Sequence, residues 1–356
     1  MAFDLIPHHL YHIIAFLVST NIVLLTTPLV KDIALKSGRF DRPGERKIHK
    51  QPMVRLGGVS IFLGALTALL VVWGLGGFNP NGHFLPTDKE FEIWGVTIGG
   101  LAFFIIGLAD DLYGLSPLFR LLMQTAVACI VWFVGVQIEF LSVPFDGLVH
   151  IGWLSLPVTV IWLVGMANAI NWIDGVDGLA AGVSGIAAVV MLFVSLFMNQ
   201  PAAALIAAAL AGGALGFLRY NFNPAQIFMG DGGAYYMGFT LAGVGVIGLV
   251  KATAVTSVVL PYVILAVPIL DMSAVIVDRI RRGKSPFAGD NSHLHHRLLN
   301  AGLSQRLTVL FIYSLTLWVG SLALVFSGIP SGLIYASGAT GLLIYTSWKV
   351  WRNKRF

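Results

Sequence analysis

The sequence has few charged residues and a single cysteine. Of its 356 residues, 11% are charged and 57% are hydrophobic, whereas an ordinary soluble domain carries about 25% charged residues. This composition excludes a soluble globular protein. The one cysteine, Cys129, excludes an internal disulfide framework and a zinc site built on cysteines. No basic segment precedes the first apolar run, 12–29, so we expect a membrane span there and not a cleavable signal.

Long apolar runs recur from one end of the chain to the other. A helix of about 20 apolar residues crosses a hydrocarbon core of roughly 30 Å, and continuous runs favour helices over alternating strands. The sequence therefore predicts an all-α, polytopic membrane protein, and residues 1–356 contain no repeat or linker that would divide them into domains. Pro261 and Pro268 predict a break in the ninth span. The eleven candidate spans are 12–29, 56–75, 93–109, 118–136, 154–169, 179–198, 202–217, 234–250, 256–277, 307–326 and 332–348.

The distribution of Lys and Arg predicts the orientation in the membrane. With eleven spans, 20 of the 22 Lys and Arg residues fall on one face, and only Lys89 and Lys251 fall on the other. Basic loops stay on the cytoplasmic side, so we expect the N-terminus outside and the C-terminus in the cytoplasm of a bacterial plasma (inner) membrane. The net charge of +5 then reflects membrane lipids at the anionic cytoplasmic surface, and nucleic acid is not an expected partner.

Aspartates gather on the same face, although Lys and Arg alone defined it. Acidic side chains at the ends of spans are costly unless they bind something. A single acidic rim on the cytoplasmic side therefore predicts a functional site. Its members are Asp110, Asp111, Asp174, Asp177, Asp231, Asp271 and Asp290.

Asp110 and Asp111 directly follow an apolar run. Adjacent carboxylates at the end of a helix suit a hard divalent ion, Mg²⁺ first and Mn²⁺ as an alternative. The competing interpretation is an acidic helix-terminal turn. In that case the pair opposes the helix dipole and needs a compensating cation.

Asparagine and aspartate recur at every third position between the fifth and sixth spans. This spacing would align along a 3₁₀ turn, and Gly175 and Gly178 allow the backbone to leave helical geometry. Polar helix caps could explain one Asn and one Asp but hardly four, while a transporter with unwound helices would show a similar pattern. The four residues are Asn168, Asn171, Asp174 and Asp177.

A glycine-rich segment precedes the eighth span. It contains Asp231 among Gly230, Gly232 and Gly233, which let backbone amides approach an anion while the acid takes a metal. Asp231 could instead serve only as an N-cap. Upstream, Asn221 offers an amide and Phe228 a stacking face near the same rim.

Two further clusters lie on this face. His293, His295 and His296 suggest metal binding, phosphate binding or proton transfer, and without cysteines we favour donors to a phosphate-bearing ligand. The basic segment 46–50 could hold a multiply charged anion against the acids or a metal.

In this order, the motifs between residues 46 and 296 resemble those of the polyprenyl-phosphate N-acetylhexosamine-1-phosphate transferases, which include MraY-, WecA- and TagO-type enzymes. The resemblance implies Mg²⁺-dependent transfer of a sugar 1-phosphate from a UDP-sugar to a polyprenyl phosphate, normally undecaprenyl phosphate, with release of UMP. The order His293-Leu294-His295-His296 looks like the GlcNAc-1-phosphate branch and favours UDP-GlcNAc as donor for a lipid-linked cell-envelope glycan. A homodimer is left open.

The resemblance also implies roles for individual residues. Asp110 and Asp111 match the acidic pair, implied in catalysis, in engaging the lipid phosphate and in binding metal, and Asp231 matches the Mg²⁺-binding acid. The implied catalytic set is completed by Asp174, Asp177, His293, His295 and His296. The implied substrate-binding residues are Lys47, His49, Lys50, Asn168, Asn171, Asn221 and Phe228.

Two departures from the family pattern stand out. Gly114 and Leu118 occupy positions where the branch that uses UDP-MurNAc-pentapeptide carries lysines, and Gly289 precedes Asp290 where the family has proline. UDP-MurNAc-pentapeptide as donor and a cation-coupled transporter remain the alternatives. The sequence also leaves open whether transfer takes one step or passes through an aspartyl-phosphoryl intermediate.

Overall fold

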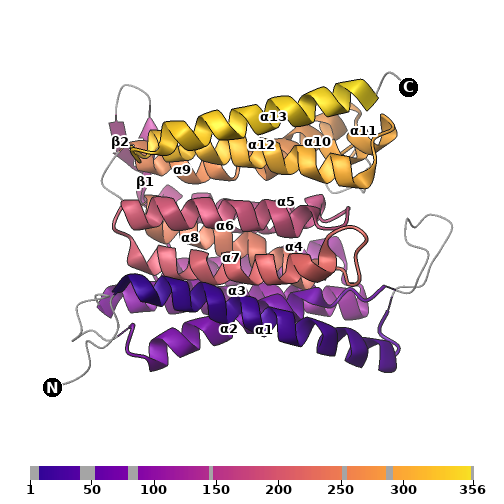
Figure 1. The fold of residues 1–356 in the computed structure, drawn as a ribbon. Helices are drawn as coiled ribbons and strands as arrows, with labels where there is room; N and C mark the ends of the chain where they lie inside the picture. Colours follow the sequence, from indigo (N-terminus) through magenta and orange to yellow (C-terminus); the bar gives the residue numbers. More distant parts are fainter. Residues whose placement is uncertain are drawn as a thin grey trace.

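The structure, a computed structural model, describes residues 8–40, 53–78, 87–143, 147–250, 255–285 and 292–353. The described ranges form long helices joined by short connections and one small hairpin (Figure 1). The α-helices are α1 (His8–Lys36), α2 (Gly57–Gly74), α3 (Thr87–Tyr113), α4 (Pro117–Phe133), α5 (Ser155–Ile173), α6 (Leu179–Phe197), α7 (Pro201–Asn221), α8 (Gly230–Val244), α9 (Val255–Ile264), α10 (Ala266–Arg281), α11 (Leu294–Asn300), α12 (Gln305–Phe326) and α13 (Gly332–Asn353). A 3₁₀ turn, η1 (Gly152–Leu154), precedes α5, and a π-helix, η2 (Gly245–Val250), continues α8.

Each of the eleven predicted spans overlaps at least one of these helices. Within the described ranges, seven helices are long and apolar enough to cross a membrane, or eight if the bent pair α9–α10 is counted as one span. The chain is therefore a multi-pass helical membrane protein, whereas the count of eleven and the orientation stay predictions. Helices α4 and α8, at 17 and 15 residues, are among those that fall short.

The predicted break in the ninth span is confirmed. Helices α9 and α10 meet at Leu265 with a bend of 73°. Pro268 lies in the first turn of α10, where its missing N–H removes no helical hydrogen bond. A proline at this position lets a new helix begin in a new direction.

The predicted all-α class is confirmed, and one short hairpin accompanies the helices. Strands β1 (Phe140–Val143) and β2 (Gly147–His150) pair antiparallel, with Phe140 opposite His150. Four-residue strands are too short to stand out against long apolar runs. The expected 3₁₀ alignment is wrong, because α5 stays α-helical to Ile173 and the chain leaves helical geometry only in the following turn.

Helix α8 lies at the centre of the bundle, packed against α2, α3 and α5. Nearly all of its residues are buried, and small residues permit the close approach: a Cβ on Gly238 would collide with the main chain of α5 at Met166 and Ala167. The hairpin lies at one end of the bundle, and α11 and the C-terminal end of α13 lie at the other (Figure 1). The candidate site lies at the end that carries α11.

Candidate functional site

The end of α3 and the start of α8 meet without intervening side chains. At Gly107, a Cβ would collide with the main chain of Asp231 and Gly232. At Gly230, φ is +75°, and a Cβ would collide with the carbonyl group of Arg55. Glycine at these two positions lets the carboxylates of α3 reach the first turn of α8.

Asp111 caps the N-terminus of α8. Its Oδ1 accepts a hydrogen bond from the main-chain N–H of Asp231 at 3.1 Å, and its Oδ2 accepts one from Gly232 at 3.0 Å. The first N–H groups of a helix have no partner within the helix and carry partial positive charge. The carboxylate of Asp111 near the end of α3 thus accepts hydrogen bonds from main-chain N–H groups at the start of α8.

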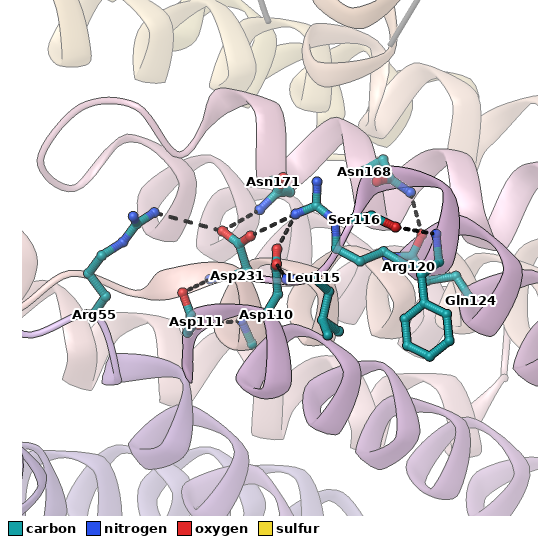
Figure 2. Close-up of polar contacts among 12 residues, drawn as sticks. Arg55, Asp110, Asp111, Leu115, Ser116, Arg120, Gln124, Asn168, Asn171 and Asp231 are labelled. Carbon is teal, nitrogen blue, oxygen red and sulfur yellow. Dashed lines mark hydrogen bonds and ion pairs between the residues drawn. The ribbon is translucent and has the colours of Figure 1, made fainter. Parts of the chain in front are cut away.

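Asp110 and Asp231 share one guanidinium. Nη1 of Arg120, on α4, donates to Oδ2 of Asp110 and, at 3.2 Å, to Oδ2 of Asp231 (Figure 2). The second Asp110 oxygen accepts a hydrogen bond from the N–H of Leu115 at 2.7 Å. A cation therefore lies between two carboxylates that come from different helices, and it compensates the dipole of α3 as an acidic helix end requires.

Two more groups approach Asp231 from other elements. Nδ2 of Asn171 on α5 donates to its Oδ1 at 3.0 Å, and Nη2 of Arg55 lies 3.9 Å from the same oxygen (Figure 2). Asp231 lies in the first turn of α8, whose N-cap residue is Met229, so it is not the N-cap. We call Asp110, Asp111, Asp231, Arg120 and Asn171 the acidic centre.

Asn168 points away from Asp231. One turn before Asn171 on α5, its Nδ2 donates to Oε1 of Gln124 at 2.7 Å and to the carbonyl of Val164 at 2.8 Å (Figure 2). Gln124 is fully buried on α4. This contact joins α5 to the helix that carries Arg120.

Asp174 ends α5 as its C-cap residue. Burial raises the pKa of its carboxyl group to about 7; Asp111 and Asp177 add to the rise, and the positive charge of Arg55 opposes it. Among the described residues, no hydrogen bond or ion pair reaches this carboxylate. Its ionisation state therefore changes near neutral pH, as a group that accepts protons requires.

Asp177 and Asn221 organise the loops around Gly178. Oδ2 of Asp177 accepts hydrogen bonds at 3.0 Å from Nδ2 of Asn223 and from the N–H of Ala225. Asn221 accepts from the N–H of Gly178 at 3.1 Å and donates to the carbonyl of Ile227 at 2.9 Å. Gly178 has a φ of +78°, as its predicted departure from helical geometry requires.

Phe228 joins the same loops to the segment before α2. Its N–H donates to the carbonyl of Val54 at 2.8 Å, and its carbonyl accepts from the N–H of Gly57 at 2.9 Å. Its side chain is partly exposed. The main chain of this residue thus fixes the start of α2 beside the start of α8.

The three histidines, which we call the histidine cluster, lie together around the start of α11. The ring centroids of His295 and His296 are 4.2 Å apart, and those of His293 and His295 are 5.7 Å apart. Asp271 on α10 holds the first histidine: its Oδ2 lies 2.8 Å from Nδ1 of His293, and its Oδ1 accepts from the N–H of Leu294 at 2.7 Å.

The last turn of α5 borders this cluster. Trp172 packs edge-on against His293 with centroids 5.8 Å apart, and a Cβ on Gly175 would lie 2.6 Å from Nε2 of His295. Burial, reinforced by the neighbouring imidazoles, lowers the pKa of His295 to about 3. This imidazole is therefore neutral at physiological pH.

The structure thus brings most of the predicted site residues to one end of the bundle. Asp110, Asp111, Asp231 and Asn171 meet directly, and the histidines border the same α5 turn as Asp174. Lys47, His49, Lys50 and Asp290 lie outside the described residues.

Sequence reasoning missed Arg120 as a member of the site. Its signal was present: it is a single arginine at the start of an apolar helix, ten residues after the acidic pair. The lysines missing at positions 114 and 118 pointed to the same need for a cation. Asp271 was expected on the acidic rim but without a role, and Gln124 carried no signal in the sequence; the contacts show what each of them holds.

Comparison with known proteins places these observations in a family. Residues 93–249 match the family model described as Glycosyl transferase family 4. The chain is 39% identical over 302 residues to the "Probable undecaprenyl-phosphate N-acetylglucosaminyl 1-phosphate transferase" of Bacillus subtilis, an alignment that covers 85% of this chain and 81% of the relative.

Two other relatives are similar to this chain. The "Decaprenyl-phosphate N-acetylglucosaminephosphotransferase" of Mycolicibacterium smegmatis is 33% identical over 353 residues, covering 92% of this chain and 84% of its own. The "Phospho-N-acetylmuramoyl-pentapeptide-transferase" of Caldanaerobacter subterraneus is 34% identical over 239 residues, 63% of this chain and 75% of its own. The resemblance drawn from the motifs is confirmed: the chain belongs to glycosyl transferase family 4, the MraY/WecA/TagO family of membrane phosphoglycosyltransferases.

Proposed function

We propose that this protein transfers GlcNAc-1-phosphate from UDP-GlcNAc to a polyprenyl phosphate, undecaprenyl phosphate in the first instance, and releases UMP. The product would begin a lipid-linked glycan of the bacterial cell envelope. The names of the relatives with 33–39% identity over most of the chain support both substrates. Family membership leaves the transporter alternative without support.

The single observation that carries the proposal is the acidic centre. Carboxylates from α3 and α8 converge on one guanidinium at the end of the bundle where Asp174 also lies. Joining a diphosphate to a lipid phosphate brings several negative charges together, and such a reaction needs fixed positive charge in a site with little water. Arg120 supplies one positive charge among three aspartates, so a divalent cation would have to supply the rest.

The residues present fit Mg²⁺ by their chemistry. Within the described ranges, no three His, Cys, Asp or Glu side chains form a cage that could hold a metal ion alone. Mg²⁺ rarely needs one, because it is usually held by one or two carboxylates together with substrate phosphates and water. Asp231 and Asp110 would supply those carboxylates, with Asp111 adjacent. When bound, the ion neutralises charge on the diphosphate and on the departing UMP.

The protein's own groups then divide the remaining work. Arg120 is placed to attract the phosphate of the lipid acceptor, and Asn171 holds Asp231 in position through its hydrogen bond. Asp174 is suited to take up a proton near neutral pH because burial raises its pKa to about 7. His293 is suited to donate a hydrogen bond to a phosphate oxygen while Asp271 fixes its other ring nitrogen.

We favour one-step attack of the acceptor phosphate oxygen on the β-phosphorus of UDP-GlcNAc. In this step a phosphorus–oxygen bond to the acceptor forms, and the bond to the UMP oxygen breaks. A covalent sugar-phosphate adduct on an aspartate, trapped without lipid acceptor, would contradict it and establish the two-step path.

The experiment is UMP release by the detergent-purified full chain. UDP-GlcNAc, Mg²⁺ and undecaprenyl phosphate are supplied together and then omitted one at a time. We expect release only when all three are present, and none from Asp231→Asn. Asp278→Asn is the matched control, since Asp278 pairs with Arg282 on the exposed side of α10. If Asp278→Asn also lost UMP release, the loss in Asp231→Asn would be ascribed to misfolding and not to the missing carboxylate.

The donor is the finer point of the proposal. Similarity to a phospho-N-acetylmuramoyl-pentapeptide transferase makes UDP-MurNAc-pentapeptide the second candidate. Release with that donor and none with UDP-GlcNAc would keep the chemistry and overturn the choice of sugar. No release with either donor, from protein whose folding is verified, would overturn the proposed function.

A further inference from the structure

A basic cavity lies at the same end of the bundle, between the start of α12 and the end of α13. Its volume is about 500 Å³. Among its lining residues in the described ranges, three are cations and none is an acid. The lining residues used below are Arg306, Lys349, Arg352, Trp348, Leu307 and Leu310.

The cavity is separate from the acidic centre. The acidic centre is built by α3, α4, α5 and α8, whereas the lining residues of this cavity in the described part of the chain come from α12, its N-cap Ser304 and α13. None of its lining residues belongs to a motif that the proposed function uses. Its occupant is therefore not assigned by the transfer reaction.

The wall of the cavity combines cationic groups with apolar surface. The guanidinium of Arg352 lies 5.6 Å from the centre of the Trp348 ring, and Leu310 leaves 47% of its surface exposed beside them. Cations above an aromatic ring and next to an exposed leucine match a ligand with an anionic head and a hydrocarbon tail. A soluble anion would use only the first of these features.

The position along α13 matches the depth of a lipid headgroup. The helix exposes apolar side chains over most of its length, including Leu333 and Ile334 at 72% each. Tyr345 and Trp348 follow, half exposed, and then come Lys349 and Arg352. Apolar residues, then aromatic residues, then cations are the order in which a helix leaves the hydrocarbon core for the headgroup layer.

We propose that this cavity binds the phosphodiester of an anionic membrane phospholipid, with the lipid tail along Leu307, Leu310 and Trp348. Basic pockets between transmembrane helices on the cytoplasmic side are suited to such headgroups. The N-terminus of α12 adds its partial positive charge at the same place.

One cation of the cavity also reaches the site loops. Nε of Arg306 donates to Oδ1 of Asn223 at 3.2 Å, and Asn223 donates to Asp177 at 3.0 Å. A variant of Arg306 would therefore disturb both places at once. Lys349 and Arg352 lie over the Tyr345 and Trp348 rings of α13 itself, so they are the residues to change.

The test measures lipid binding to the detergent-purified full chain by native mass spectrometry. The probes are phosphatidylglycerol and phosphatidylcholine. We expect wild type to prefer phosphatidylglycerol, and the Lys349→Gln/Arg352→Gln double variant to bind it about tenfold more weakly. The control double variant, Arg281→Gln/Lys284→Gln, removes the same charge from the exposed end of α10 and should keep wild-type affinity.

Four results would overturn the proposal. The first is equal weakening in both double variants, which would indicate general attraction to a basic surface. The second is equal affinity of wild type for the two lipids. The third is displacement of phosphatidylglycerol by millimolar inorganic phosphate, which would make the cavity a soluble-anion site. The fourth is displacement by undecaprenyl phosphate, which would make it an acceptor site.

These readouts do not depend on enzymatic activity. A failure of lipid binding is therefore distinguishable from a failure of the proposed function. Thermal unfolding of each variant at one pH verifies that a loss of binding does not reflect loss of the fold.

Discussion

The acidic centre and the histidine cluster lie beside the same turn of α5 but balance their charges differently. In the acidic centre, Asp110 and Asp231 face Arg120, whose guanidinium stays protonated at any pH that the protein meets. In the histidine cluster, Asp271 faces the imidazole ring of His293 and the main-chain N–H of Leu294 instead. The end of α5 joins the two, because Asn171 contacts Asp231 and Trp172 contacts His293.

The difference shows how each region holds its geometry. Asp111 is tied to main-chain N–H groups at the start of α8, so the acidic centre is fixed by the ends of packed helices. In the histidine cluster, one carboxylate on α10 orients both the His293 ring and the first N–H of α11. Removing the positive charge of Arg120 should therefore abolish the function of the acidic centre. Removing the carboxylate that orients His293 should weaken the function of the histidine cluster.

The largest effect is expected from Arg120. Arg120→Ala leaves Asp110 and Asp231 facing each other without their shared cation, and we expect a loss of UMP release of about 100- to 1000-fold. Arg120→Lys should recover part of it, because a lysine keeps the charge but lacks the planar fork of the guanidinium. Steady-state UMP release at saturating Mg²⁺ measures both variants.

Arg281→Gln is the matched control because Arg281 is exposed at the end of α10. Unchanged release in Arg120→Ala, with its fold intact by thermal unfolding, would mean that the shared cation is not needed. The acidic centre would then differ from the histidine cluster in structure only.

A smaller effect is expected from Asp271, which we treat as a positioning residue. Asp271→Asn keeps an oxygen that can accept from Leu294, but it replaces the charged partner of His293. Groups that orient a functional histidine are worth about 10- to 100-fold, so we expect a fall of that size in kcat. The pH dependence of the rate should also move, since the imidazole has lost its carboxylate.

The control for this variant is Asp278→Asn, which lies on the same helix in an exposed pair with Arg282. A lower unfolding temperature with an unchanged pH–rate profile would reduce Asp271 to a structural contact. That result would mean that the two regions differ in structure but that the orientation of His293 by Asp271 does not affect function.

The sequence predicted the elements better than their contacts. The helices, the break near Pro268 and the acidic end all follow from local patterns: apolar length, proline position and the alternation of charge between loops. Arg120 and Asp231, by contrast, are separated by 111 residues, and Asn223 and Gln305 by 82. In a membrane protein, an apolar run indicates that a segment lies in contact with lipid, but it does not indicate which other helices that segment packs against.

The regular spacing of Asn and Asp shows the same limit at short range. Asn168 turns toward Gln124, Asn171 toward Asp231, and Asp177 toward Asn223. An α-helix rotates residues three apart by about 300°, so Asn168 and Asn171 diverge within α5, while Asp177 lies in the turn beyond the end of the helix. The spacing marked residues at the site, but their separate roles depend on helices far away in sequence.

The smallest effect tests the pH dependence of the histidine cluster through stability. The pKa of His295 falls from 6.5 to about 3 on folding, chiefly through burial. Between these values the unfolded chain binds a proton that the folded chain does not, so the free energy of unfolding should decrease as pH falls from 6.5. His295→Gln removes this group, and its unfolding temperature should fall by several degrees less than that of wild type between pH 7 and pH 5.

The readout is the slope of the unfolding temperature against pH, because lost packing lowers the unfolding temperature at both pH values. His150→Gln, on the exposed end of β2, should keep the wild-type slope. Equal slopes in wild type and His295→Gln would show that this imidazole does not oppose protonation, and the histidine cluster would then differ from the acidic centre only in the groups that its carboxylate faces.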